Sequence, residues 1–75
     1  MSIYASPFEG VQVEAGATQA GALFISVKNT GAKVALLNGI ALAPGEVRSY
    51  PFLGKPYQAI PYDPQGSELT ILYIL

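Results

Sequence analysis

The chain has 75 residues, of which 51% are hydrophobic and only 12% charged, and it contains no cysteine, histidine or tryptophan. This length allows one small domain, residues 1–75, and the missing cysteines exclude a disulfide framework and thiolate chemistry. The net charge of −1 comes without a basic cluster, which argues against a nucleic-acid partner.

The first third of the chain contains two candidate strands and a flexible segment. Residues 2–5 are a candidate edge strand that Ser6-Pro7 ends, because proline cannot donate a ladder hydrogen bond. Residues 10–14 alternate apolar and polar side chains, which is the period of a half-buried strand. Residues 15–21 are small and include two glycines that oppose a helix, so a wide loop is predicted there.

Residues 22–50 are predicted to form one hydrophobic hairpin around Asn38-Gly39. Residues 22–29 form its first strand, with Phe24 on the more polar face, and Asn29-Thr30-Gly31 is a predicted turn.

Asn38-Gly39 itself joins strands predicted at residues 33–37 and 40–42. This dipeptide is typical of a type I′ turn, because both central residues need positive φ. Pro44-Gly45 predicts a type II turn, and residues 47–50 form the next strand.

The last third of the chain contains a short strand, a turn and a strongly apolar strand. These are predicted at residues 57–60, 63–66 and 69–75. Turn signals therefore recur about every 8–12 residues, which is typical of all-β sandwiches and barrels. We predict an all-β fold, a small antiparallel β-sandwich or barrel-like module with an Asn-Gly hairpin and no helix longer than about two turns.

Residues that carry catalysis or bind metals are sparse. Without histidine and cysteine, most nucleophile, base and zinc-ligand arrangements are missing, and the close acidic pairs are Glu9 with Glu14 and Asp63 with Glu68. Each acid lies where a solvated side chain is expected. Residues 63–68 faintly suggest a cation loop, but a β-turn in which Asp63 accepts from the backbone two residues on is favoured. We predict no catalytic residue, no metal site, no cofactor and no enzyme activity.

Aromatic side chains concentrate in the segment between residues 50 and 63. Tyr50, Tyr57, Tyr62 and the adjacent Asp63 are a candidate surface for a carbohydrate or protein ligand, because a tyrosine ring offers both an apolar face and a polar tip. The simpler interpretation, which we favour, is that these rings belong to the core and its rim.

The C-terminal strand has two apolar faces. Its predicted core face carries Leu69, Ile71, Tyr73 and Leu75. On the opposite face Leu72 and Ile74 follow two polar residues, and leaving them in water would forgo roughly 1.5–3 kcal/mol each. We therefore predict that Leu72 and Ile74 lie in the interface of a closed homo-oligomer, with a trimer as the expected size. The alternative is a central strand in a fully covered monomeric sheet.

Two stretches carry a resemblance to known proteins. Val27-Lys28-Asn29-Thr30-Gly31 and Leu42-Ala43-Pro44-Gly45-Glu46 resemble the strand-and-turn pattern of small β-sandwich modules of bacterial surface proteins and of tailed-phage virions, including head-decoration and fibre-associated subunits. Both stretches lie between residues 27 and 46. The resemblance implies a structural or adhesive role and carries over no functional residue.

Together these observations predict a non-enzymatic structural or assembly protein that forms a symmetric homo-oligomer, virion- or surface-associated, with other structural proteins as further partners. The alternative is a small carbohydrate- or protein-binding module that uses the segment from residue 50 to 63. No hydrophobic run approaches the roughly 18 residues of a membrane helix. The first residues lack a basic, apolar leader, so a soluble chain without membrane insertion or signal peptide is expected in the cytoplasm or a virion.

Overall fold

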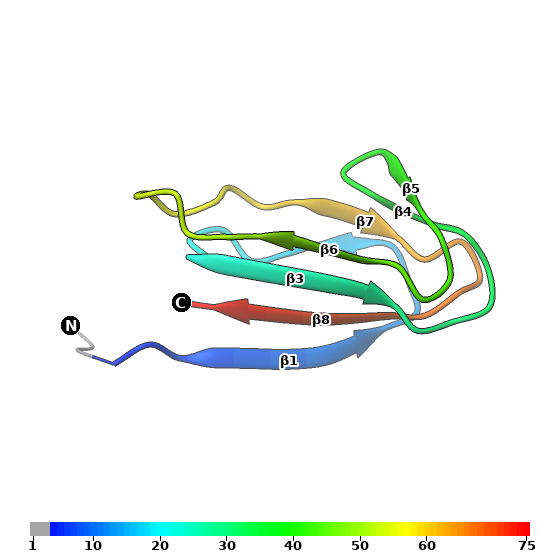
Figure 1. Cartoon of the computed structure of the whole chain (residues 1–75), viewed down its shortest axis with the longest axis horizontal. Helices are drawn as coiled ribbons and strands as arrows, with labels where there is room; N and C mark the ends of the chain where they lie inside the picture. The colour runs from blue at the N-terminus through cyan, green and yellow to red at the C-terminus, as the bar shows by residue number, and fades with distance from the viewer. Residues whose placement is uncertain (1–3) are drawn as a thin grey trace.

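The computed structural model describes residues 4–75, which form two four-stranded antiparallel sheets packed against each other (Figure 1). Sheet A contains, in spatial order, β1 (Pro7–Gln12), β8 (Leu69–Ile74), β3 (Phe24–Asn29) and β6 (Val47–Tyr50). Sheet B contains, again in spatial order, β2 (Gly16–Ala17), β7 (Pro61–Asp63), β4 (Ala35–Leu37) and β5 (Ile40–Leu42). The predicted all-β sandwich is confirmed.

The core lies between the two sheets and follows the alternation of each strand. Val27 of β3 pairs in register with Ile71 of β8, and both side chains point inward and are buried. The buried apolar set comprises Ala22, Ile25, Val27, Ala35, Leu37, Leu42, Ile60, Leu69 and Ile71. Tyr73 and Leu75 pack against this set, so the predicted core face of the C-terminal strand is confirmed.

The hydrophobic stretch from residue 22 to 50 is divided between the two sheets, so the prediction of one hairpin is wrong. β3 pairs with β6 in sheet A, whereas β4 pairs with β5 in sheet B. Residues 30–34 cross from sheet A to sheet B, and residues 43–46 cross back (Figure 1). The physical reason is that a sandwich buries both sheets' inner faces at once, which a single two-stranded hairpin cannot do.

Strand boundaries near the N-terminus also differ from expectation. Residues 1–3 lie outside the described part of the chain, and Tyr4 and Ala5 are not in a strand. β1 begins at Pro7. Proline has no backbone N–H, and it is tolerated there because the first position of an edge strand does not have to donate a ladder hydrogen bond. Its register, from Pro7 beside Ile74 to Gln12 beside Leu69, moves the strand toward the N-terminus from the predicted residues 10–14.

Two further segments were predicted differently. Residues 57–60 form no strand, because only Tyr57 makes an isolated bridge, to Ala22, and β7 starts at Pro61. The turn predicted at residues 63–66 is displaced by one residue, since the Ser67 N–H donates to the Pro64 carbonyl (2.9 Å). The predicted contact of Asp63 is confirmed, because its Oδ1 accepts from the N–H two residues on (3.0 Å).

Both glycine turns of the central region have the predicted geometry. At the β4–β5 hairpin, Leu37 pairs with Ile40, and Asn38 and Gly39 have φ values of 53° and 76°, as a type I′ turn requires. In the second turn, Gly45 has φ 81° and the Glu46 N–H donates to the Ala43 carbonyl (2.9 Å), as in a type II turn.

Replacing Gly39 with Val is expected to lower the free energy of unfolding by about 1–2 kcal/mol. A Cβ at this position would meet no atom within 4 Å, so the whole effect comes from a β-branched residue at φ 76°. Thermal unfolding should show a drop of about 4–8 °C per kcal/mol. Gly39→Asn is the control, because asparagine tolerates positive φ and should lose much less. Equal melting temperatures for the Val variant and the wild type would contradict the turn assignment.

A buried amide holds the crossing loops together at the end of β3. Asn29 was predicted as the last residue of its strand and the first residue of a turn, and it lies fully buried at the end of β3. Its Nδ2 donates to the carbonyls of Lys33 (2.7 Å) and Leu42 (2.8 Å). Its Oδ1 accepts from the Gly31 N–H (3.1 Å) and the Ser67 hydroxyl (2.7 Å). Every hydrogen-bonding site of this side chain is therefore used.

Candidate functional site

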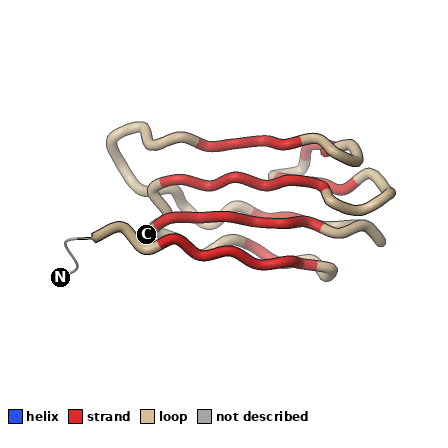
Figure 2. Tube along the Cα trace, turned by 60° about the horizontal axis from the view of Figure 1, so that its bottom comes forward, coloured by secondary structure: helices blue, strands red, loops and turns tan. Residues whose placement is uncertain are grey.

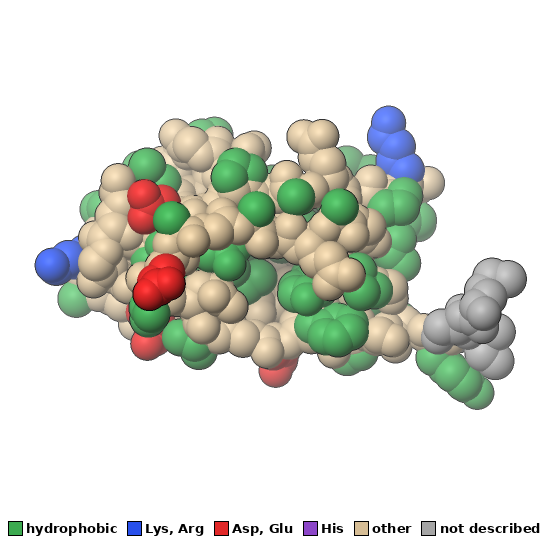
Figure 3. Space-filling model, turned by 180° about the vertical axis from the view of Figure 1, so that it is seen from behind, with side chains coloured by type: hydrophobic (Ala, Val, Ile, Leu, Met, Phe, Trp, Pro, Cys, Tyr) green, Lys and Arg blue, Asp and Glu red, His purple; other side chains and the backbone are tan. Residues whose placement is uncertain are grey.

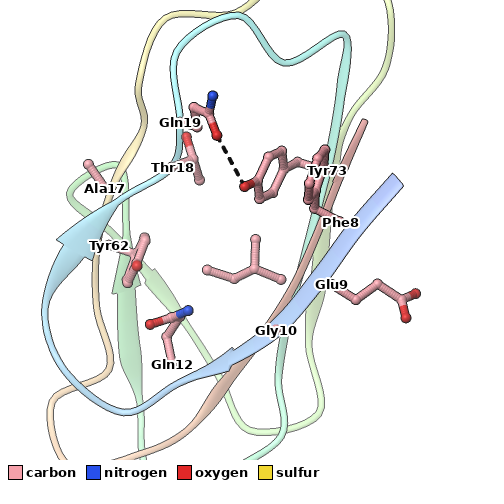
Figure 4. A pocket seen from close by; sticks show the side chains of 10 residues that line it. Phe8, Glu9, Gly10, Gln12, Ala17, Thr18, Gln19, Tyr62 and Tyr73 are labelled. Carbon is pink, nitrogen blue, oxygen red and sulfur yellow. Dashed lines mark hydrogen bonds between the residues drawn. The ribbon is translucent and has the colours of Figure 1, made fainter. Parts of the chain in front are cut away.

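The two lateral seams between the sheets are closed to different degrees. On the β6 side, the Arg48 guanidinium reaches across and donates to the backbone carbonyls of Leu37 (3.3 Å) and Ala41 (3.0 Å). On the other side, between β1 and β2, a cleft of about 350 Å³ remains (Figure 4). Only the hydroxyl of Tyr73 bridges this seam among the described residues, in a long hydrogen bond to Gln19 Oε1 (3.4 Å).

Three aromatic rings line the cleft. Phe8 of β1 stacks on Tyr73 of β8, with ring centroids 5.2 Å apart and planes inclined by 15°. Tyr62 of β7 stands on the opposite wall (Figure 4), and its hydroxyl lies close to Gly16 of β2. A Cβ at position 16 would lie 2.9 Å from the Tyr62 hydroxyl, so glycine leaves the room that this ring occupies.

The remaining walls carry amide groups, and Glu9 is the one charged residue among those that line the cleft. Gln12 and Gln19 line the cleft, and Gln12 makes no side-chain hydrogen bond within residues 4–75. Thr18 is held in place because its hydroxyl accepts from the Ile60 N–H (2.9 Å). Glu9 belongs to the same strand as Gln12, but its carboxylate points away from the cleft (Figure 4). Seen from behind, the molecule shows Lys and Arg side chains only toward its two ends, whereas Asp and Glu side chains also appear between them (Figure 3).

The structure divides the tyrosine-rich segment between two places. Tyr50 and Tyr57 form an edge-to-face pair at 5.8 Å, half-buried against the core, and the Tyr57 hydroxyl donates to the Pro51 carbonyl (2.5 Å). Tyr62 lies in the cleft, whereas the Asp63 carboxylate accepts the Gln65 N–H in the turn that follows β7. The four residues therefore form no common surface, and the first two match the interpretation as core and rim.

Sequence reasoning missed most of the cleft. Phe8, Gly10 and Gln12 alternate along β1 and therefore share its inner face. The strand had been predicted at residues 10–14, so this alternation was not recognised. The long-range pairing that brings Tyr73 beside Phe8 has no local sequence signature.

Leu72 and Ile74 lie on the outer face of sheet A, half-buried. β8 is a central strand, between β1 and β3, as the alternative interpretation had it. However, sheet B covers only the inner face of sheet A, and in Figure 2 no strand or loop of residues 4–75 crosses the outer face.

Comparisons with family models, with curated proteins and with solved structures found no match. No helix long and apolar enough to cross a membrane occurs within the described residues. Nor do residues 4–75 hold any group of three or more His, Cys, Asp and Glu side chains placed for a metal ion.

Proposed function

We propose that the protein is a non-enzymatic structural protein whose copies assemble into a closed homo-oligomer through the outer face of sheet A. The observation that supports this proposal is a contiguous apolar surface on that face, here called the apolar row. It consists of Pro7, Phe24, Leu72 and Ile74. A role at a virion or cell surface follows from the resemblance of the strand-and-turn pattern to such modules.

The apolar row results from the register of three adjacent strands. Ile74 pairs with Pro7 of β1 on one side and with Phe24 of β3 on the other. Leu72 occupies the next outward position of β8, between Glu9 and Ser26. Side chains on one face of neighbouring strands lie about 5 Å apart, so these four form one surface and not scattered contacts.

Burying this surface favours association. Phe24, Leu72 and Ile74 are only half-buried within one chain, so a second copy would remove their remaining apolar area from water, at roughly 25 cal/mol per Å². A contiguous exposed apolar surface is typical of interaction sites.

The charges beside the apolar row suit a second copy of the same chain. Glu9 lies on the β1 side of β8, and Lys28 lies on the β3 side, next to Thr70. A surface with an acid on one flank and a base on the other suits a closed ring, because the acid of each copy then faces the base of the next copy.

The double variant Leu72→Glu with Ile74→Lys should dissociate the assembly. Charging the centre of the row removes its apolar area and leaves charges without partners in the interface. Size exclusion with light scattering should show a defined wild-type oligomer, with three copies expected, and a monomeric variant. The matched control is Val34→Glu with Ile40→Lys, which charges two side chains that are 48% and 59% exposed outside sheet A, and it should keep the wild-type mass.

Two outcomes would contradict the proposal: a wild type that stays monomeric at all concentrations, or a double variant that keeps the wild-type mass.

A third variant distinguishes an interface on the outer face of sheet A from one in which a strand of a second copy pairs with the free edge of β1. Ser6 and Leu75 exchange both backbone hydrogen bonds, so by alternation Glu9 and Val11 direct theirs to the free edge of sheet A. Val11→Pro removes one of these donors. If Val11→Pro fails to assemble while the Leu72→Glu/Ile74→Lys variant still assembles, the interface lies at the edge of β1.

A further inference from the structure

We infer that the cleft between β1 and β2 is a binding site for a neutral carbohydrate. This site is distinct from the apolar row, because Phe8, Gly10 and Gln12 face inward on β1, whereas Pro7 and Glu9 face outward. Its volume of about 350 Å³ lies within the range of small-ligand sites. The opposite seam, closed by Arg48, shows that this fold can seal such a gap with one side chain.

The lining matches the chemistry of a sugar. The Gln12 amide, without a partner in residues 4–75, offers both a donor and an acceptor, and so fits hydroxyl groups, which also do both. The Gln19 Nε2 is similarly left free while its Oε1 accepts from Tyr73. Aromatic rings such as Tyr62 supply apolar faces against which the C–H face of a pyranose can pack.

The same lining disfavours charged ligands. No Lys or Arg side chain lines the cleft, so a phosphate or a nucleic acid would find no counter-charge there. The Glu9 carboxylate points away from the cleft and cannot serve a cationic ligand inside it (Figure 4). An uncharged molecule with many hydroxyl groups remains the best chemical fit.

Gly10 is the second observation that points to a ligand. It lies in the middle of β1, facing inward beside Ile71, where a glycine weakens a strand. A Cβ there would meet only Gln12 Nε2, at 3.6 Å, so nothing in the packing requires glycine at this position. Glycine inside a strand often marks a place where a ligand approaches the backbone closely. Its absent side chain keeps the floor of the cleft open.

The test is a titration of the isotopically labelled protein with neutral oligosaccharides, followed by amide resonances in NMR spectra. The panel contains gluco-, xylo-, malto- and chito-oligosaccharides. At least one of them should shift the side-chain amides of Gln12 and Gln19, with a dissociation constant on the order of 1 mM or tighter. Gly10→Val should weaken binding at least tenfold by filling the cleft, while its melting temperature stays equal to or above that of the wild type.

One further test variant and two controls make the result specific. Val11→Thr changes the outward face of the same strand and should bind as the wild type does. Gln12→Ala should weaken binding without filling the cleft, so the conclusion does not depend on one variant. The Leu72→Glu/Ile74→Lys variant should bind sugar normally, which separates this site from the proposed assembly.

The inference would be overturned by resonances that move with none of the sugars, or by binding that survives in both Gly10→Val and Gln12→Ala. Cleft amides that shift with protein concentration instead of sugar would also overturn it, because a second copy of the chain would then fill the cleft.

Discussion

Replacing Asn29 with Asp is expected to lower the free energy of unfolding by about 3–5 kcal/mol, the scale of a buried charge that has lost its partners. The Asn29 Nδ2 now donates to the carbonyls of Lys33 and Leu42. In the variant, a carboxylate oxygen would face both carbonyls, with no donor between them and no water at a fully buried position.

This effect is large for so small a domain. At about 0.05–0.15 kcal/mol per residue, the whole chain has a stability of roughly 4–11 kcal/mol. Urea unfolding followed by circular dichroism measures the loss. Asn38→Asp is the matched control, because this substitution makes the same chemical change in an exposed turn. The free energy of unfolding of this variant should stay within about 0.5 kcal/mol of the wild-type value. Equal losses in the two variants would show that Asn29 does not hold the crossing loops.

Replacing Gly31 with Ala is expected to cost about 3 kcal/mol or more, by overpacking and by displacing the Ser67 hydroxyl from its hydrogen bond to Asn29. The new Cβ would overlap Ser67 Oγ and lie 2.5 Å from the backbone N of Glu68. This neighbour cannot move freely, because the Gly31 N–H donates to the Glu68 carbonyl (3.2 Å).

Chemical denaturation of the Gly31→Ala variant tests this contact, and Gly10→Ala is the control because its Cβ would meet no atom closer than 3.6 Å. Ser67→Gly should not rescue the variant, since the clash with the Glu68 backbone remains. A Gly31→Ala protein as stable as the wild type would mean that residues 30–34 do not pack on residues 67–68.

Local chemistry in the sequence determined the turns and the strand faces. Asn38-Gly39 and Pro44-Gly45 adopt the predicted geometries because positive φ is a property of the residues at the turn itself. The alternation along β8 likewise assigned Leu69 and Ile71 to the core and left Leu72 outside, since a strand's side chains point to opposite faces whatever its partners are.

Only the tertiary structure decided which strands pair and what lies between them. β8 sits between β1 and β3, although long stretches of chain separate the three, and this pairing sets the boundary of β1 and brings Phe8 against Tyr73. Asn29 has the sequence signature of a turn residue, yet its partners include Leu42 and Ser67, far away along the chain. Turn and strand patterns record each residue's own conformational preference, whereas pairing, the buried amide and the cleft depend on burial shared between distant segments.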